Sequence, residues 1–266
     1  MRQIGLQTYT VRKLMKEDLE LTFSELKSMG IQQIEVSRMP INDDTAQKIS
    51  EYQFDVCSLQ ITMKKLFNDA EEIIRFARTV NANHVVVSVL PWWGHIPVIG
   101  IKRFVKKMHE LQRIYEKEGI ILSFHHHAYE IKNDILPVLD KWLDKKIGFI
   151  IDTYWITFSK KDPLEVYQDF KHRVKGIHLR DYVDGHDITP GKGNIDFKRI
   201  FGQVPDTVYT VIEENAKDPL IAIKEAKHYL EGLLWHKNRL ATKKKCYSLG
   251  VTSLVVVHKP WLAYSI

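Results

Sequence analysis

Cysteine is scarce in this chain, and long apolar runs are missing from it. The two cysteines, Cys57 and Cys246, stand far apart and form no disulfide framework, which favours a reducing compartment. No apolar stretch approaches the ~18 residues that a transmembrane helix needs, so we expect no membrane partner. Met1 and Arg2 lead at once into the strand-like run Gln3–Thr8, where a signal peptide would have an apolar core. The sequence therefore predicts a cytoplasmic protein.

An excess of basic charge is also missing from most of the chain. The 266 residues carry 39 Lys and Arg against 33 Asp and Glu, for a net charge of +6. Six of the bases and none of the acids fall within residues 235–266, so residues 1–234 are balanced at 33 against 33. A neutral body lacks the basic face that nucleic-acid binding requires, and we expect no nucleic-acid partner. The hydrophobic fraction of 44% excludes global disorder, and the length suffices for one large α/β domain.

A strand-length apolar run followed by a stretch with helical spacing recurs eight times in residues 1–234. The predicted strands are Gln3–Thr8, Gln32–Ser37, Phe54–Ile61, His84–Leu90, Ile120–His125, Ile147–Asp152, Val174–Arg180 and Thr207–Glu213. Eight such units in this length predict a single-domain α/β fold, the (β/α)8 TIM barrel. The alternative is an open doubly wound sheet, but the Gly-rich first turn typical of that fold is absent from Gln7–Thr10.

Residues 235–266 do not continue this pattern. They contain the polar run Lys243–Lys245 and one β-prone piece, Ser253–Val257. A lone strand is marginally stable without a partner, so no function follows from this piece. We expect the last helix of the barrel to run from Pro219 to about Leu234, and we treat residues 235–266 as a basic tail of unknown structure.

Polar side chains gather where the predicted strands end, which is the face on which TIM barrels carry their active sites. The strands end on Gln7 and Tyr9, Glu35, Gln60, Ser88, His125–His127, Asp152, His178–Asp181 and Glu213–Asn215. Side chains two residues apart share a face of a strand, so His125 and His127 point one way and His126 the other. The last four strands can thus aim His, Asp, His and Glu at one point. Such a mixed set suits one divalent ion and does not choose among Mn²⁺, Mg²⁺, Zn²⁺ and Co²⁺.

Each of these residues taken alone also has a structural interpretation. A single His on a strand is more often a hydrogen-bonded core residue than a ligand, and Asp152 could cap the next helix. Trp92 and Trp93 are as typical of a barrel plug as of a platform for a sugar ring. Pro190–Gly193 lacks the spacing of a phosphate-binding loop. The coincidence of His and carboxylate residues on the last four strands is what favours a site.

Six motifs in order extend over about residues 3–234. They are Ile4–Arg12 (IGLQTYTVR), Phe124–Glu130 (FHHHAYE), Ile151–Trp155 (IDTYW), His178–Asp181 (HLRD), Gly191–Asp196 (GKGNID) and Val211–Asn215 (VIEEN). In these motifs the chain resembles the sugar phosphate isomerase/epimerase family of xylose-isomerase-like TIM barrels. The FHHHAYE motif is similar to the Y-H-N-H motif of one branch. The family also contains inosose dehydratases and enzymes that process 3-keto-glycosides.

The resemblance implies one divalent metal ion, held by carboxylates and one His at the ends of the last four strands. Asp152, His178 and Glu213 fall on three of the ligand positions. The fourth ligand is either His125, which stands at the aligned position, or Glu130, which we favour. The resemblance therefore predicts a metal site and leaves one of its ligands open.

The motif on the fifth strand departs from the branch pattern. Phe124 removes a hydroxyl group, and His126 and Ala128 replace Asn and Asp. Without a ligand Glu on this strand, the two-glutamate scheme of the ketose 3-epimerases is incomplete, and a His would have to act as acid and base. This departure favours dehydratase or keto-sugar β-elimination chemistry.

We expect a metal-dependent isomerase or epimerase that removes a proton next to a carbonyl of a sugar, keto-sugar or polyol, with an enediolate stabilised by the metal. The predicted catalytic residues are His125, His127 and Glu213, and the predicted metal ligands are Glu130, Asp152, His178 and Glu213. The predicted substrate-binding residues are Gln7, Tyr9, Trp92, Trp155 and Arg180. The alternative is a dehydratase or lyase on the same scaffold. More distant alternatives are an endonuclease IV-like DNA repair nuclease and a non-catalytic sugar binder, and a homo-oligomer stays open.

Overall fold

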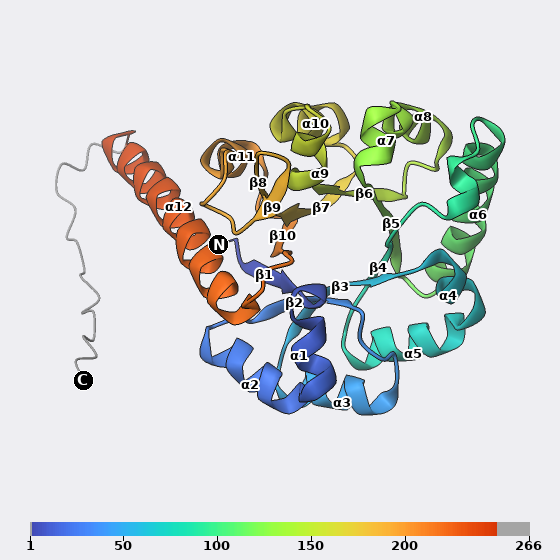
Figure 1. Cartoon of the computed structure of the whole chain (residues 1–266), viewed down its shortest axis with the longest axis horizontal. Helices are drawn as coiled ribbons and strands as arrows, with labels where there is room; N and C mark the ends of the chain where they lie inside the picture. Colours follow the sequence, from blue (N-terminus) through green and yellow to red (C-terminus); the bar gives the residue numbers. More distant parts are fainter. Residues whose placement is uncertain (1, 249–266) are drawn as a thin grey trace.

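Eight parallel strands close into a barrel in the computed structural model, which describes residues 2–248 (Figure 1). The barrel strands are β1 (Ile4–Gln7), β2 (Gln33–Ser37), β3 (Asp55–Ile61), β4 (His84–Val87), β5 (Ile121–His125), β6 (Gly148–Asp152), β7 (Val174–Leu179) and β10 (Tyr209–Ile212), and a separate hairpin is formed by β8 (Asp181–Val183) and β9 (His186–Ile188). Their order around the barrel is β1-β10-β7-β6-β5-β4-β3-β2, and β1 pairs with both β2 and β10. This closure confirms the predicted (β/α)8 barrel, and every barrel strand lies within its predicted range.

Helices surround the strands on the outside of the barrel (Figure 1). They are α1 (Arg12–Glu17), α2 (Leu19–Ser28), α3 (Asp43–Glu51), α4 (Met63–Asn68), α5 (Ala70–Thr79), α6 (Ile99–Glu116), α7 (Ala128–Lys132), α8 (Ile135–Trp142), α9 (Thr153–Phe158), α10 (Pro163–Phe170), α11 (Phe197–Gln203) and α12 (Pro219–Ser248), with the 3-10 helices η1 (Thr8–Val11) and η2 (Trp92–His95). Apolar residues at helical spacing face inward, so that Phe23 and Leu26 of α2 and Phe104, Met108 and Leu111 of α6 are fully buried. The apolar core therefore lies between the helices and the strands, and the strand ends are left for polar residues.

Asp181 fixes the loop that follows the β8–β9 hairpin. Its buried carboxylate accepts hydrogen bonds from the backbone N–H groups of Gly191, Gly193 and Ile195, at 2.9, 2.9 and 3.0 Å. A Cβ atom at position 193 would overlap this carboxylate, so only glycine fits there. The Gly191–Asp196 motif is thus a structural turn, in agreement with its lack of phosphate-loop spacing.

Helix α12 is longer than predicted. We expected it to end near Leu234, but it continues to Ser248, so the first part of the predicted tail 235–266 is helical. Residues 235–248 contain neither glycine nor proline, and their Lys, Arg, Leu and Ala favour a helix. The β-prone piece Ser253–Val257 lies outside the described residues. Among residues 2–248, no helix combines the length and the apolar composition that a membrane crossing requires.

Candidate metal centre

Four buried donors meet at the carboxyl ends of adjacent strands. His125 ends β5, Asp152 ends β6, His178 lies near the end of β7 and Glu213 directly follows β10. One donor atom from each of the four lies within 4.8 Å of those of the other three. The strand register explains this, because Asp152 pairs with His178 across β6 and β7, and His178 pairs with Val211 across β7 and β10. The structure thus brings together the donors that the sequence placed on its last four strands.

His178 lies between two carboxylates. Its Nε2 atom is 2.7 Å from Glu35 Oε1, and its Nδ1 atom is 2.7 Å from Glu213 Oε2. Glu35 is fully buried, and its second oxygen accepts hydrogen bonds from the hydroxyl groups of Ser58 and Tyr209. Histidine ligands of metal ions are typically held in this way by a carboxylate at the ring nitrogen that does not bind the metal.

Glu35 was not among the predicted site residues. The sequence carried one signal, because an acid in the middle of an apolar strand will be buried and then needs partners. Those partners are Ser58 of β3, His178 of β7 and Tyr209 of β10. They come from three strands that are distant in the sequence, and only the closed barrel brings their side chains together.

The charges of this cluster follow from burial and from its contacts. Burial disfavours a charged imidazole, but the carboxylates of Glu35 and Glu213 outweigh it and raise the pKa of His178 to about 10. Burial alone would raise the pKa of Glu35, yet the charged His178 lowers it to about 2. Burial alone would raise the pKa of Asp152, but Arg180, His125 and His178 together lower it. With no ion bound, a protonated His178 and Arg180 therefore offset two of the three negative charges of Glu35, Asp152 and Glu213.

The imidazole nitrogens in this cluster fit a metal ion. His125 Nδ1 lies 3.3 Å from the backbone carbonyl of Ser88 and donates to it, so that Nε2 offers a lone pair to the cluster. The buried His125 Nε2 lies 3.6 Å from Asp152 Oδ2, and the buried His178 Nδ1 lies 2.7 Å from Glu213 Oε2, so both nitrogens face carboxylates of the cluster. Two imidazoles and two carboxylates form a donor set that several divalent cations accept. The cluster can therefore hold a divalent ion.

Arg180 connects the cluster to the β8–β9 hairpin. Its Nη1 atom is 3.3 Å from Asp152 Oδ2 and 3.5 Å from Glu213 Oε1. Its Nη2 atom is 2.6 Å from Asp187 Oδ2 on β9, and the guanidinium group also lies over two aromatic rings of α9. Neither Asp187 nor the hairpin was predicted, because a three-residue strand has too few positions to show a period.

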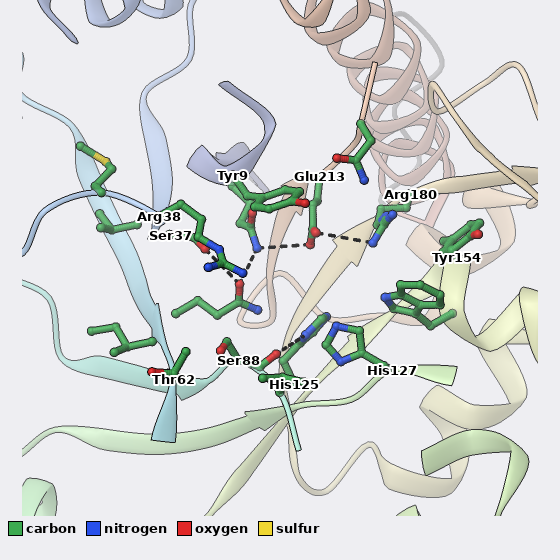
Figure 2. A pocket seen from close by; sticks show the side chains of 18 of the residues that line it. Tyr9, Ser37, Arg38, Thr62, Ser88, His125, His127, Tyr154, Arg180 and Glu213 are labelled. Carbon is green, nitrogen blue, oxygen red and sulfur yellow. Dashed lines mark hydrogen bonds and ion pairs between the residues drawn. The ribbon is translucent and has the colours of Figure 1, made fainter. Parts of the chain in front are cut away.

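A cavity of about 490 Å³ opens beside the cluster (Figure 2). Its lining includes Gln7, Tyr9, Gln60, His125, His127, Tyr154, Trp155, Arg180, Asp187 and Glu213. Gln7 Nε2 donates to Gln60 Oε1 at 2.6 Å and to Glu213 Oε2 at 3.2 Å, which ties this part of the wall to the donors. Trp92 is the one predicted substrate-binding residue outside the lining, and it is 81% exposed on η2.

Glu130 is not among the four clustered donors. Its carboxylate accepts a hydrogen bond at 2.8 Å from the backbone N–H of His127 at the start of α7. His125 takes the fourth position, so we replace Glu130 by His125 in the candidate ligand set. His126 points away from the cavity, as strand parity predicts, and its Nε2 accepts from the backbone N–H of Asp152 at 3.2 Å.

Metal binding should release about one proton near pH 7.5. The reason is that His178, with a pKa of about 10, is protonated in the metal-free protein and must lose this proton to become a ligand. Protons compete with the ion, so the metal affinity should fall about tenfold for each pH unit below 9. Calorimetric titration in buffers of different ionisation enthalpy measures the released proton. No proton release between pH 7 and 8 would contradict this assignment.

Glu35→Gln should weaken metal binding about 10- to 100-fold, because the amide no longer holds His178 with a negative charge. Competition with a chromogenic chelator measures the dissociation constant. Glu51→Gln, on the exposed end of α3, is the matched control and should leave the dissociation constant unchanged. Equal affinities of the two variants would show that Glu35 has no part in metal binding.

The chain is similar to known proteins in sequence and in fold. The inosose dehydratase of Clostridium perfringens is 26% identical over 145 residues, which are 46% of this chain and 49% of that enzyme, so the chain spans about half the length of this curated relative. Among solved structures, a sugar phosphate isomerase/epimerase from Parabacteroides distasonis has a TM-score of 0.73 at 18% identity, over 86% of this chain and 93% of that one. The 3-keto-D-glucoside 4-epimerase of E. coli has a TM-score of 0.68 at 18% identity, over 87% and 100% of the two chains. A barrel protein from Mycobacterium smegmatis in complex with magnesium has a TM-score of 0.62 at 14% identity, over 81% and 88%.

The likeness to these solved structures concerns the fold. A family model describing the xylose isomerase-like TIM barrel matches residues 23–239, which is most of the barrel. The chain belongs to the xylose isomerase-like TIM barrel family.

Proposed function

We propose that this protein is a metal-dependent enzyme that moves a proton next to a carbonyl group of a sugar, keto-sugar or polyol, as an isomerase or epimerase. The observation that carries the proposal is the set of four buried donors beside a 490 Å³ cavity. The similarity to a 3-keto-D-glucoside 4-epimerase and to an inosose dehydratase supports the substrate class.

The ion would be held by His125, Asp152, His178 and Glu213. When bound, it supplies Lewis acidity that stabilises the negative charge developing on the substrate oxygens. Arg180 adds a second positive charge on the side of Asp152 and Glu213, where it can donate to a substrate oxygen. The cluster thus concentrates positive charge where an enediolate would carry negative charge.

His127 and Glu213 are the proton-transfer groups in this proposal. His127 lines the cavity, and its buried Nδ1 lacks a partner among the described residues. Burial, followed by the nearby His125, lowers the pKa of His127 to about 2, so the ring is neutral and weakly basic in the free protein. The negative charge of a bound substrate must raise this pKa before the ring accepts a proton. Glu213 follows β10, which is separated from β5 by two strands, so the two groups approach a bound substrate from different sides.

Aromatic side chains complete the substrate site. Trp155 and Tyr154 lie on the wall formed by α9, and Tyr9 lies on the wall formed by η1. Their rings offer apolar faces for the C–H groups of a carbohydrate, and Gln7 offers an amide for a hydroxyl group. This mixture suits a small polyhydroxylated ligand.

A dehydratase is the second candidate. The observation that favours it is the place of His127 on the cavity wall, directly before α7, where one imidazole can serve both the C–H group and a departing hydroxyl group. The curated relative from Clostridium perfringens is an inosose dehydratase, which agrees with this chemistry.

Solvent exchange tests the proposal for both candidates. Metal-loaded protein incubated with keto-sugars and inososes in deuterated water should introduce deuterium next to the carbonyl, as detected by NMR. Epimers then indicate the first candidate, and an unsaturated product with ultraviolet absorbance indicates the second. His127→Gln should abolish exchange and retain the metal, whereas His186→Gln on the exposed β9 should change neither. Absence of exchange with every metal and substrate of these classes would refute the proposed function.

A further inference from the structure

Exposed apolar side chains are concentrated in one segment of the surface, between β4 and α6. Ten large apolar side chains are exposed within residues 2–248, and five of them fall within residues 89–99. These five are Val89, Trp92, Ile96, Val98 and Ile99, with exposed fractions from 42% for Val89 to 81% for Trp92. The other five are spread over α2, β5, α8 and α12. Val89 alone of the segment lines the cavity, so substrate binding does not account for the remaining four.

A strained turn presents two of these side chains. Val98 directly precedes α6 and has a φ angle of +59°. Of the seven non-glycine residues with positive φ within residues 2–248, Val98 is the one with a branched Cβ atom, which this conformation disfavours most. Strain of this kind is concentrated at functional sites. The fold thus maintains a strained turn next to two apolar side chains, Val98 and Ile99, that it leaves exposed.

The apolar segment continues into a basic face of α6, which lies on the outside of the barrel (Figure 1). Positions three, four and seven residues beyond Ile99 share its face of the helix. Exposed bases occupy these positions, namely Lys102, Arg103 and Lys106. We call the five apolar residues and these three bases the β4–α6 surface.

The positive charge of the β4–α6 surface is not balanced by neighbouring acids. Residues 88–109 contain no Asp or Glu. Glu110, the first acid after them, forms its ion pair with Lys107. Within residues 2–248 the three bases of the surface form no ion pair, and Arg103 lies 4.7 Å from the ring of Trp93. A partner of this surface must therefore bring negative charge together with an apolar layer.

We propose that the β4–α6 surface docks on an anionic lipid surface. Trp and Ile side chains insert at the boundary between headgroups and acyl chains, and Lys and Arg beside them attract anionic headgroups. Docking of this kind needs no spanning helix, so our expectation of no membrane partner, which rested on the lack of a long apolar run, concerns spanning only. None of the metal donors takes part, and the inference is therefore independent of the proposed function.

Two observations favour lipid over the other partners of this chemistry. Trp92, Val98 and Ile99 are each more than half exposed, so they project from the protein, whereas a groove for a peptide would cover its side chains from both sides. A second copy of the chain on this surface would bring the unpaired bases of the two copies together, and like charges repel across an interface.

Vesicle sedimentation with the full chain tests the docking. At low salt the protein should bind vesicles of phosphatidylcholine and phosphatidylglycerol at least about tenfold more tightly than vesicles of phosphatidylcholine alone, and added salt should reduce the difference. The double variant Trp92→Ser/Ile99→Ser should bind the anionic vesicles at least about tenfold more weakly. Lys102→Gln/Lys106→Gln should lose about fivefold for each charge removed.

Matched controls remove the same residue types elsewhere on the surface. Trp142→Ser/Ile221→Ser replaces an exposed Trp on α8 and an exposed Ile on α12. Lys141→Gln/Lys145→Gln removes two exposed charges near the end of α8. Both controls should bind anionic vesicles as the unmodified protein does.

The outcomes distinguish lipid from the other partners. Absence of binding to anionic vesicles, or binding that Trp92→Ser/Ile99→Ser leaves unchanged, overturns the proposal. Sedimentation equilibrium gives the oligomeric state, and a dimer that this variant dissociates would assign the surface to a second copy instead. An amphipathic peptide with Glu on its polar face is the probe for a protein partner. Binding of this peptide without binding of vesicles would assign the surface to an acidic protein and also overturn the proposal.

Discussion

His178→Ala is expected to bind its metal about 100-fold more weakly and to lose its turnover at least in proportion. The substitution removes one of four donors, and a quarter of the ~10–16 kcal/mol typical of a four-ligand zinc site is about 3 kcal/mol. It also leaves Glu35 fully buried without its imidazolium partner, so the pKa of Glu35 should rise and its charge be lost. Metal content after dialysis and the rate of solvent exchange measure the two effects.

Two further variants make this result specific to metal binding. His178→Gln preserves a polar side chain and should weaken metal binding in the same way, which separates the loss of a ligand from the loss of the fold. His172→Ala removes an exposed imidazole paired with Asp140 and should keep full metal content. If His178→Ala binds metal as the unmodified protein does, the candidate metal centre is wrongly assigned.

Gly176→Ala should destabilise the barrel by about 3 kcal/mol and weaken metal binding as well. Gly176 pairs with Tyr209 across β7 and β10, and a Cβ atom at position 176 would overlap the Tyr209 ring. Overpacking of this kind costs about 1–3 kcal/mol. The displaced Tyr209 hydroxyl would also lose its 2.8 Å hydrogen bond to Glu35. Thermal unfolding should show a Tm lower by roughly 6–12 °C, and chelator competition the weaker metal binding.

A double-mutant cycle identifies the ring as the cause. Tyr209→Val empties the space that the new methyl group needs, so Gly176→Ala should cost much less in that background. Gly202→Ala is the control, since no atom lies within 4 Å of a Cβ at this exposed position of α11 and the substitution should stabilise the helix slightly. Additive effects of the first two substitutions would show that the overlap with Tyr209 is not the source of the destabilisation.

The barrel could be predicted from the sequence because strands and helices repeat with different periods. Each apolar run, such as Gly148–Asp152, is long enough to show its period, and the strand closure follows from eight repeats. The predicted end of α12, near Leu234, was wrong. From residue 235 on, the composition changes from mixed charge to basic charge, and such a change does not stop a helix. Charge composition does not determine where a helix ends, and in a sequence only glycine, proline or a capping residue marks that end.

The site was predictable to the extent that its donors end strands. Asp152, His178 and Glu213 do so, and strand parity separated His125 from His126. Glu130 shows the limit, since a Glu at the third position of a helix is drawn to the free backbone N–H groups at its start. Whether such a residue caps a helix or turns towards a neighbouring strand depends on geometry that a sequence does not contain.

Asp187 shows the same limit for charged partners. Its contact with Arg180 depends on a hairpin that Asp181 anchors by gathering backbone N–H groups from the loop beyond it. The sequence showed the motif that contains Asp181, but it did not show that the buried carboxylate of Asp181 helps to position Asp187. The sequence was therefore sufficient to predict the metal donors, but not the residues that orient them.

The placement of Arg180 and a protonated His178 among the carboxylates has a consequence for how the holoprotein is assembled. Two internal cations already offset most of the negative charge of this cluster, so folding does not depend on a bound ion. Small zinc domains behave in the opposite way, because their ligands come together only around the metal. Here the polypeptide can fold first and bind its metal ion afterwards. Protein from which a chelator has removed the ion should stay folded and should bind a different divalent ion. The identity of the bound ion would then be decided by the supply in the surroundings as much as by the protein.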